Sequence, residues 1–168
     1  QSTGKDTSFS TGVDAAGSYF VVVTSDYYYH DSGEYGVTAS ISEVLGNTET
    51  EYNGAPASAD ELTDGQELRG QLSTYQDLDV YQIDMDQAGM IAVEFDAPTD
   101  SSYNDYFWVV LSDYDGNTLA AQSTGKDTSF SAGVDAAGSY YVAVSSASSY
   151  NHQSGEYGVT ASISEVLG

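Results

Sequence analysis

The sequence predicts an all-β protein, a jelly-roll-like antiparallel β-sandwich, and two observations indicate this class. Apolar and polar residues alternate with a period of two along most of the chain, which is the pattern of half-buried strands and not of amphipathic helices. Fifteen tyrosines and many valines and threonines favour strands, while 17 glycines suit the turns between short strands. An internal duplication then sets the domain organisation.

The duplicated block begins at the first residue. Residues 1–24 recur as residues 122–145, and Ser32–Gly46 recurs unchanged as Ser154–Gly168. The first pair of segments differs at four positions: Thr11/Ala132, Phe20/Tyr141, Val22/Ala143 and Thr24/Ser145. A period of about 121 residues is typical of a tandem repeat. We therefore interpret residues 1–46 as the back half of one repeat, residues 47–61 as an acidic linker, and residues 62–168 as a complete repeat.

Eight strands are expected in the complete repeat, separated by turns rich in Gly, Asp and Asn. They are Gln66–Leu72, Asp79–Met85, Met90–Phe95, Tyr106–Ser112, Thr118–Gln122, Thr128–Val134, Ser139–Ser145 and Glu156–Ser164. Residues 57–64 are expected to form a short helical turn before the first strand. About eight strands at this spacing favour a sandwich of jelly-roll type.

The two copies of the strand at 139–145 predict which of its faces is buried. Within it, the differing positions Tyr141, Ala143 and Ser145 share one parity, and the unchanged ones share the other. Alternate residues of a strand face opposite sides. We therefore expect the unchanged set to face the core. Trp108, inside the apolar run 107–111, is also expected in the core.

Composition excludes some classes of partner. Three basic against 26 acidic residues give a net charge of −23, which disfavours binding to nucleic acid or to anionic membranes and attracts divalent cations. Such a charge also suits a saline habitat, where salt screens the repulsion. There is no cysteine, and the apolar runs are too short for membrane insertion. The chain starts at Gln1 with no visible signal peptide, so we expect a piece of a processed or longer product.

Six short motifs follow one another along residues 47–168. They are Glu51–Asn53 with Ala59 and Leu62, Gly65 with Gly70–Leu72, Asp77–Tyr81 with Ala88–Gly89, Leu111–Ala120, Ala137–Val142, and Gly155–Tyr157. In this order they resemble the bacterial pre-peptidase C-terminal (PPC) domain family, which is related to the collagen-binding domains of clostridial collagenases. The resemblance implies a non-catalytic, often calcium-binding β-sandwich module of a secreted or surface protein, serving in secretion, adhesion or substrate attachment.

The linker and the entrance of the second predicted strand provide a candidate calcium site. Glu49, Glu51 and Asn53 alternate, so they point the same way in an extended segment, and Asp77 and Asp79 follow in the chain. Calcium takes six to eight such oxygen ligands. In the collagen-binding relatives a similar acidic linker and aspartate pair surround calcium, although here Gly54 replaces an aspartate that often follows. The alternative is that the two aspartates cap a turn and the glutamates are solvated.

Other motifs are weaker. The segment Asp113–Asn117 begins like an EF-hand loop but lacks the later acidic ligand, so a hairpin turn is expected. His30 and His152 lie in equivalent loops without a catalytic pattern, and we expect no enzyme activity. The loop tyrosines are candidates for contacts with sugars or proteins: Tyr27, Tyr28, Tyr29 and Tyr150.

Two functional hypotheses remain open. In the first, the chain is a structural or adhesive module of a tandem-repeat protein on the surface or outside of a bacterial-type cell, with calcium-stiffened linkers. Its partners would be copies of itself or adjacent repeats, head to tail, with residues 1–46 completing a sandwich by strand exchange unless they are a fragment of a longer array. In the second, it is an accessory module of a secreted hydrolase or peptidase that binds polysaccharide or fibrous protein.

Overall fold

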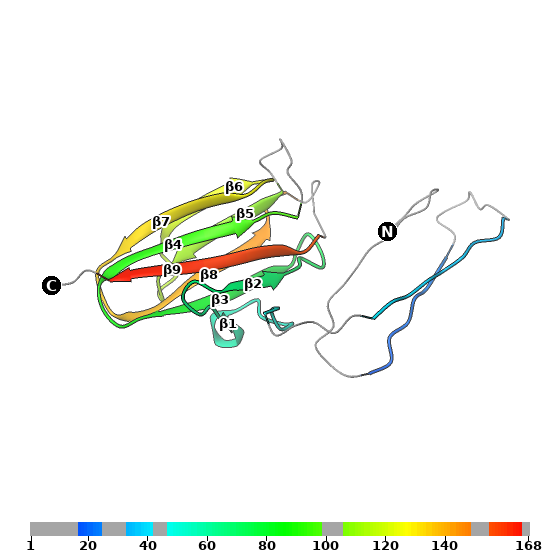
Figure 1. The fold of residues 1–168 in the computed structure, drawn as a ribbon, viewed down its shortest axis with the longest axis horizontal. Coiled ribbons are helices and arrows are strands. Elements are labelled where there is room, and N and C mark those ends of the chain that lie inside the picture. Colours follow the sequence, from blue (N-terminus) through cyan, green and yellow to red (C-terminus); the bar gives the residue numbers. More distant parts are fainter. Residues whose placement is uncertain (1–16, 25–32, 42–46, 99–105, 149–154, 166–168) are drawn as a thin grey trace.

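The computed structural model describes residues 17–24, 33–41, 47–98, 106–148 and 155–165 (Figure 1). Within these ranges the chain forms nine strands and one short 3-10 helix, Pro56–Ser58. No helix in the described ranges has the length and the apolar character needed to span a membrane.

The strands form two stacked sheets (Figure 1). The five-stranded sheet has the order β1 (Asp60–Glu61), β3 (Leu78–Met85), β8 (Gly138–Ser146), β5 (Phe107–Ser112) and β6 (Thr118–Thr124). The four-stranded sheet has the order β2 (Glu67–Gly70), β9 (Tyr157–Glu165), β4 (Gly89–Asp96) and β7 (Thr128–Val134). Neighbouring strands are antiparallel, except that β1 runs parallel to β3. The predicted all-β sandwich is confirmed.

Each of the eight predicted strands overlaps one observed strand, and the remaining strand, β1, lies where a helical turn was expected. The helical turn is confined to Pro56–Ser58. After it, the chain pairs with β3, and the backbone nitrogen of Leu62 donates to the carbonyl of Gln82 at 2.8 Å. Leu62 is buried in the core, so burial of this apolar side chain draws the segment onto the sheet edge.

The core lies between the two sheets and confirms the predicted parity of β8. Tyr140, Val142 and Val144, the unchanged positions, all belong to the core cluster, whereas Tyr141 of the other parity is buried outside it. An aromatic cluster fills the same space, with the ring centroids of Phe95 and Phe107 5.0 Å apart. Alternation of inward and outward residues along both sheets therefore accounts for the sandwich.

The predicted burial of Trp108 is wrong, because its side chain is 42% exposed. On β5 the side chains of Phe107, Val109 and Leu111 are buried, so Trp108 lies on the opposite face of the strand. In an apolar run of five residues both faces of the strand are apolar, so the sequence does not show which residues point into the core.

The described parts of the first copy, residues 17–24 and 33–41, are not strands and lie apart from the sandwich (Figure 1). Their counterparts in the second copy are β8 and β9. Tyr35 is 69% exposed, whereas its counterpart Tyr157 is 1% exposed. Almost the same residues are therefore strand or non-strand depending on whether partner strands are present, as expected where β-structure is set by context.

Candidate metal centre

The first residues of the predicted linker lie along the edge of the four-stranded sheet. The backbone of Arg69 on β2 donates to the carbonyl of Asn47 at 2.7 Å and accepts from the nitrogen of Glu49 at 2.8 Å. Thr48 forms a parallel bridge with Arg69 between these two bonds. The segment that follows is thereby held beside the domain.

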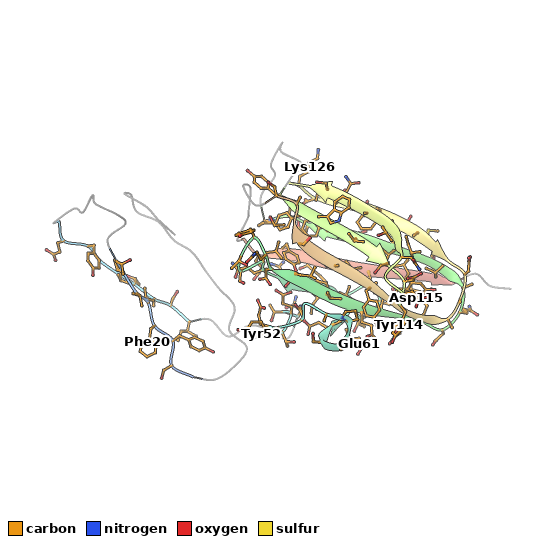
Figure 2. All side chains as sticks on the ribbon, turned by 180° about the vertical axis from the view of Figure 1, so that it is seen from behind. Phe20, Tyr52, Glu61, Tyr114, Asp115 and Lys126 are labelled. Carbon is orange, nitrogen blue, oxygen red and sulfur yellow. The ribbon has the colours of Figure 1, made fainter. Side chains whose placement is uncertain are left out.

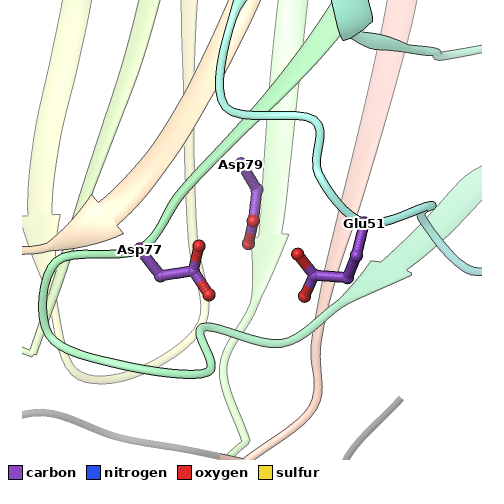
Figure 3. Close-up of side chains that lie close together, drawn as sticks. All are labelled: Glu51, Asp77 and Asp79. Carbon is purple, nitrogen blue, oxygen red and sulfur yellow. The ribbon is translucent and has the colours of Figure 1, made fainter. Parts of the chain in front are cut away.

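Three carboxylates meet where this segment passes the start of β3 (Figure 3). Glu51 comes from the linker, Asp77 from the loop before β3, and Asp79 from β3 itself. One oxygen of each lies within 4.8 Å of the others. Two oxygens that bind one calcium ion, each at about 2.4 Å, are separated by at most ~4.8 Å. The spacing therefore fits a single ion.

Asp79 is the most deeply buried of these three carboxylates. Its side chain is fully buried, and Oδ2 accepts a hydrogen bond from the hydroxyl of Tyr157, whereas Oδ1 is buried with no hydrogen-bond partner. Burial, followed by the charge of Glu49, raises the pKa of Asp79 to about 8. A buried carboxylate oxygen without a donor or cation is costly, and a bound cation removes that cost.

Asn53 offers a second buried oxygen without a partner. The side chain is 1% exposed; its Nδ2 donates to Glu49 at 3.2 Å and to Asp60 at 3.0 Å, but Oδ1 has no hydrogen-bond partner. Asn53 lines a surface cavity together with Glu51 and Asp77. The peptide bond between Glu51 and Tyr52 is cis. An amide carbonyl beside carboxylates is a donor set that suits calcium.

Glu49 does not join the three carboxylates but belongs to a hydrogen-bond network behind them. It accepts from the backbone nitrogen of Gln71 at 2.7 Å and from the hydroxyl of Tyr81 at 2.5 Å. The hydroxyl oxygens of Tyr81 and Tyr157 are 2.7 Å apart, and Tyr157 donates to Asp79. Burial is the main cause that raises the pKa of Glu49.

This network gains a third hydrogen bond when one of its carboxyl groups is protonated. The contacts Glu49–Tyr81, Tyr81–Tyr157 and Tyr157–Asp79 form a chain of three oxygen–oxygen contacts. The two tyrosine hydroxyls supply two hydrogens. The third contact becomes a hydrogen bond when Glu49 or Asp79 is protonated and donates to its tyrosine instead of accepting from it, and burial raises the pKa of each carboxyl group.

Sequence reasoning missed both tyrosines. The available signal was position, since Tyr81 follows Asp79 by two residues and so lies on the same face of β3. Gly70 completes the arrangement, because an added Cβ would collide with the hydroxyls of Tyr81 and Tyr157 and with Oε2 of Glu49. Only glycine lets β2 approach this closely.

Asp77 also caps a turn, as the alternative interpretation proposed. Its Oδ2 accepts from the backbone nitrogen and the hydroxyl of Ser73, both at 2.6 Å, and its Oδ1 accepts from the nitrogen of Leu78 at 3.0 Å. These bonds hold the carboxylate in place and leave other lone pairs for a ligand. Turn capping and cation binding are therefore compatible at this residue.

Of the remaining residues singled out from sequence, the structure describes Asp113 but not the loop tyrosines and histidines. Asp113 forms the predicted hairpin turn, because its carboxylate accepts from the nitrogen of Asn117 at 2.8 Å and Gly116 has a φ of 81°. The four loop tyrosines and both histidines lie outside the described residues: Tyr27, Tyr28, Tyr29, Tyr150, His30 and His152.

A second acidic group lines a hollow over the outer face of the four-stranded sheet. It contains Glu67, Glu94, Asp96 and Asp127, and burial, followed by a hydrogen bond with Asp127, raises the pKa of Asp96. Arg69 pairs with Glu67 at 2.7 Å beside it. Unlike the group around Asp79, no buried polar side-chain atom without a partner has been found in it among the described residues.

Comparison with known proteins gives structural matches only. No family model and no curated protein matches the chain. The crystal structure of the pre-peptidase C-terminal domain of collagenase from Bacillus anthracis matches with a TM-score of 0.50 and 20% identity, covering 65% of this chain and 99% of that domain. PliG of Aeromonas hydrophila, a periplasmic inhibitor of g-type lysozyme, matches with a TM-score of 0.47 and 14% identity, covering 63% of this chain and 96% of its own. The chain therefore has the fold of a PPC domain.

Proposed function

We propose that this chain is a non-catalytic extracellular module that binds one calcium ion at Glu51, Asp77 and Asp79, with the amide oxygen of Asn53 as a further ligand. The observation that carries the proposal is the buried, unpartnered Oδ1 of Asp79 in a group of three carboxylates. Buried ionised groups are retained where a partner or a metal compensates them. Calcium fits because every candidate ligand is a hard oxygen.

The ion would join the linker to the domain. Glu51 and Asn53 belong to the segment that precedes the sandwich, whereas Asp77 and Asp79 belong to the sandwich itself. When bound, calcium supplies positive charge among carboxylates that otherwise repel one another. The chain's own residues prepare the site: Ser73 holds Asp77, and Tyr157 holds Asp79. A ligand that binds only the docked linker stabilises that state.

We further propose that the module serves in a structural or adhesive protein of repeated units, associating with copies of itself or with adjacent repeats head to tail. The internal duplication supports this role, because two nearly identical blocks occur in one chain. The net charge of −23 supports an extracellular or cell-surface setting, including a saline one.

Calcium titration of the whole chain tests the proposed site. Calcium at 100 times its Kd is expected to stabilise the fold by about 2.7 kcal/mol, seen as a rise in Tm over the protein in EDTA. Glu51→Gln should lose most of this rise, whereas Glu61→Gln, which alters an exposed residue of β1, should keep it. Isothermal titration calorimetry should give one site per chain. Absence of heat and of a Tm shift at 10 mM calcium, a concentration about tenfold above the weakest extracellular sites, would reject the proposal.

A second candidate function is attachment of a secreted hydrolase or peptidase to a polysaccharide or fibrous protein. The exposed Trp108 supports it, since this large aromatic side chain lies on the outer face of the five-stranded sheet. The fold shared with a collagenase domain makes collagen the first fibrous protein to try.

Co-sedimentation with insoluble collagen fibres and with cellulose separates this candidate from the first. Attachment through the outer face predicts that the wild type sediments with one of them and that Trp108→Ala loses most of the bound fraction. Leu119→Ala, which alters another exposed apolar residue on the adjacent strand β6, is the matched control. Equal sedimentation of the wild type and Trp108→Ala would reject this face as the contact.

A further inference from the structure

We propose that residues 17–24 and 33–41 form the strands equivalent to β8 and β9 in a second sandwich, and that their partner is a segment equivalent to residues 47–121 that has no back half of its own. This inference rests on the proposed repeat arrangement and goes beyond it by naming the partner. It does not depend on calcium.

The apolar residues of the first copy are exposed where their counterparts form the core. Val21 is 57% exposed and its counterpart Val142 is fully buried. Val37 is 53% exposed, and its counterpart Val159 is also fully buried. Phe20, the most exposed residue of the run, is labelled in Figure 2. A run of exposed valines and aromatics of this kind marks a surface that is covered by a partner.

The second copy shows what that partner surface is. β8 lies between β3 and β5, with Val142 opposite both Tyr81 and Leu111. β9 lies between β2 and β4, with Val159 opposite both Leu68 and Phe95. All four partner residues belong to the segment 47–121. The first copy keeps the inward-facing residues unchanged. A second segment with the sequence of residues 47–121 would therefore pair with the first copy in the same register.

The segment 47–121 of the same chain cannot accept the first copy while its linker is docked. In β9, Gly158 lies opposite Arg69 and Glu165 lies opposite Gly89. These two ends of the strand are seven residues apart, or about 23 Å at ~3.3 Å per residue. The residue corresponding to Glu165 is Glu43. Thr48 follows Glu43 by five residues, which span at most ~18 Å. Thr48 is bridged to Arg69, and Arg69 lies at the opposite end of the β9 position from the one that Glu43 would occupy. Insertion in cis would therefore pull the linker off β2.

Exchange between identical chains does not help either. Each copy of residues 1–168 carries one segment equivalent to residues 47–121 and two back halves, residues 1–46 and 122–168. Any number of chains then leaves one back half per chain without a partner, however the strands are exchanged. Exchange of these strands alone therefore buries no additional apolar area, whereas an extra front half covers residues 17–24 and 33–41.

A fusion protein tests this inference on the chain as it exists. A second copy of residues 47–121 is placed before Gln1, which recreates the junction found at residues 121 and 122. We expect a monomer with two sandwiches, in which the amides of Val21 and Val37 exchange with solvent as slowly as those of Val142 and Val159. In the unfused chain they should exchange at least 100-fold faster, because they have no partner strand.

Two outcomes would overturn the inference. Fast exchange at Val21 and Val37 in the fusion, beside protected Val142, would show that residues 17–41 do not accept this partner. Protection in the unfused chain, together with concentration-dependent dimers, would show that copies satisfy each other. Both measurements, and the Tm, are made with calcium and with EDTA. Failure of the calcium site then appears as equal Tm values and is distinguishable from failure of strand pairing.

Discussion

Replacing Asp79 by Asn is expected to abolish the calcium-dependent rise in Tm and to raise the Tm of the metal-free protein at pH 8. The first effect follows because the variant loses the most buried carboxylate of the proposed site. At 100 times Kd the lost stabilisation is about 2.7 kcal/mol, which in a domain of this size amounts to on the order of 10 °C.

The second effect has a different physical cause. Burial, followed by the charge of Glu49, raises the pKa of Asp79 to about 8, so an ionised Asp79 is costly in the metal-free protein. A neutral amide avoids the cost of burying that charge. Its oxygen can still accept the bond from Tyr157, and its NH2 group would replace a carboxylate oxygen near Glu51 and Asp77. Loss of the ligand and gain of metal-free stability should therefore occur together.

Thermal unfolding followed by circular dichroism, with 10 mM calcium or EDTA, measures both effects. Asp86→Asn is the matched control, since it removes the same charge from the exposed turn after β3 and should change neither Tm by more than a few degrees. If Asp79→Asn keeps the full response to calcium, the ion binds elsewhere. If the metal-free variant is less stable than the wild type, the carboxylate of Asp79 is compensated within the protein.

The strands could be predicted from sequence because their alternation and turn residues are local signals. The duplication added a tertiary signal, since the positions that differ between the copies of β8 share one parity and lie outside the core cluster, although Tyr141 among them is also buried. Trp108 was misassigned because the run around it is apolar on both faces. β1 was not predicted because its two residues form a strand only by pairing with β3.

The carboxylate group was partly predictable for a similar reason. Alternation placed Glu49 and Glu51 on one side of an extended segment, and the structure does bring Glu51 to Asp77 and Asp79. Spacing could not show that Glu49 instead meets Tyr81, because that contact depends on how the linker lies along β2. It also could not show which oxygens lack partners, since a missing partner is a property of the packed interior.

Substituting Asp for Val142 is expected to unfold the sandwich, whereas the same change at its counterpart Val21 is expected to have almost no effect in the same chain. Val142 is fully buried between β3 and β5, so an ionised side chain there costs several kcal/mol, comparable to the whole stability of a typical domain. Val21 is more than half exposed, and surface changes of this kind are usually within about 0.5 kcal/mol.

Urea denaturation followed by the fluorescence of the single tryptophan measures the difference. Trp108 lies on β5 opposite Ser145 of β8, so its environment reports the loss of β8 directly. Val142→Ala and Val21→Ala are the matched controls, expected to cost about 2 kcal/mol and close to nothing, respectively. Similar losses at the two positions would mean that Val21 already has a partner in the chain as it stands. In the fusion with an added front half, by contrast, Val21→Asp should become as damaging as Val142→Asp, because the same residue then has the same neighbours.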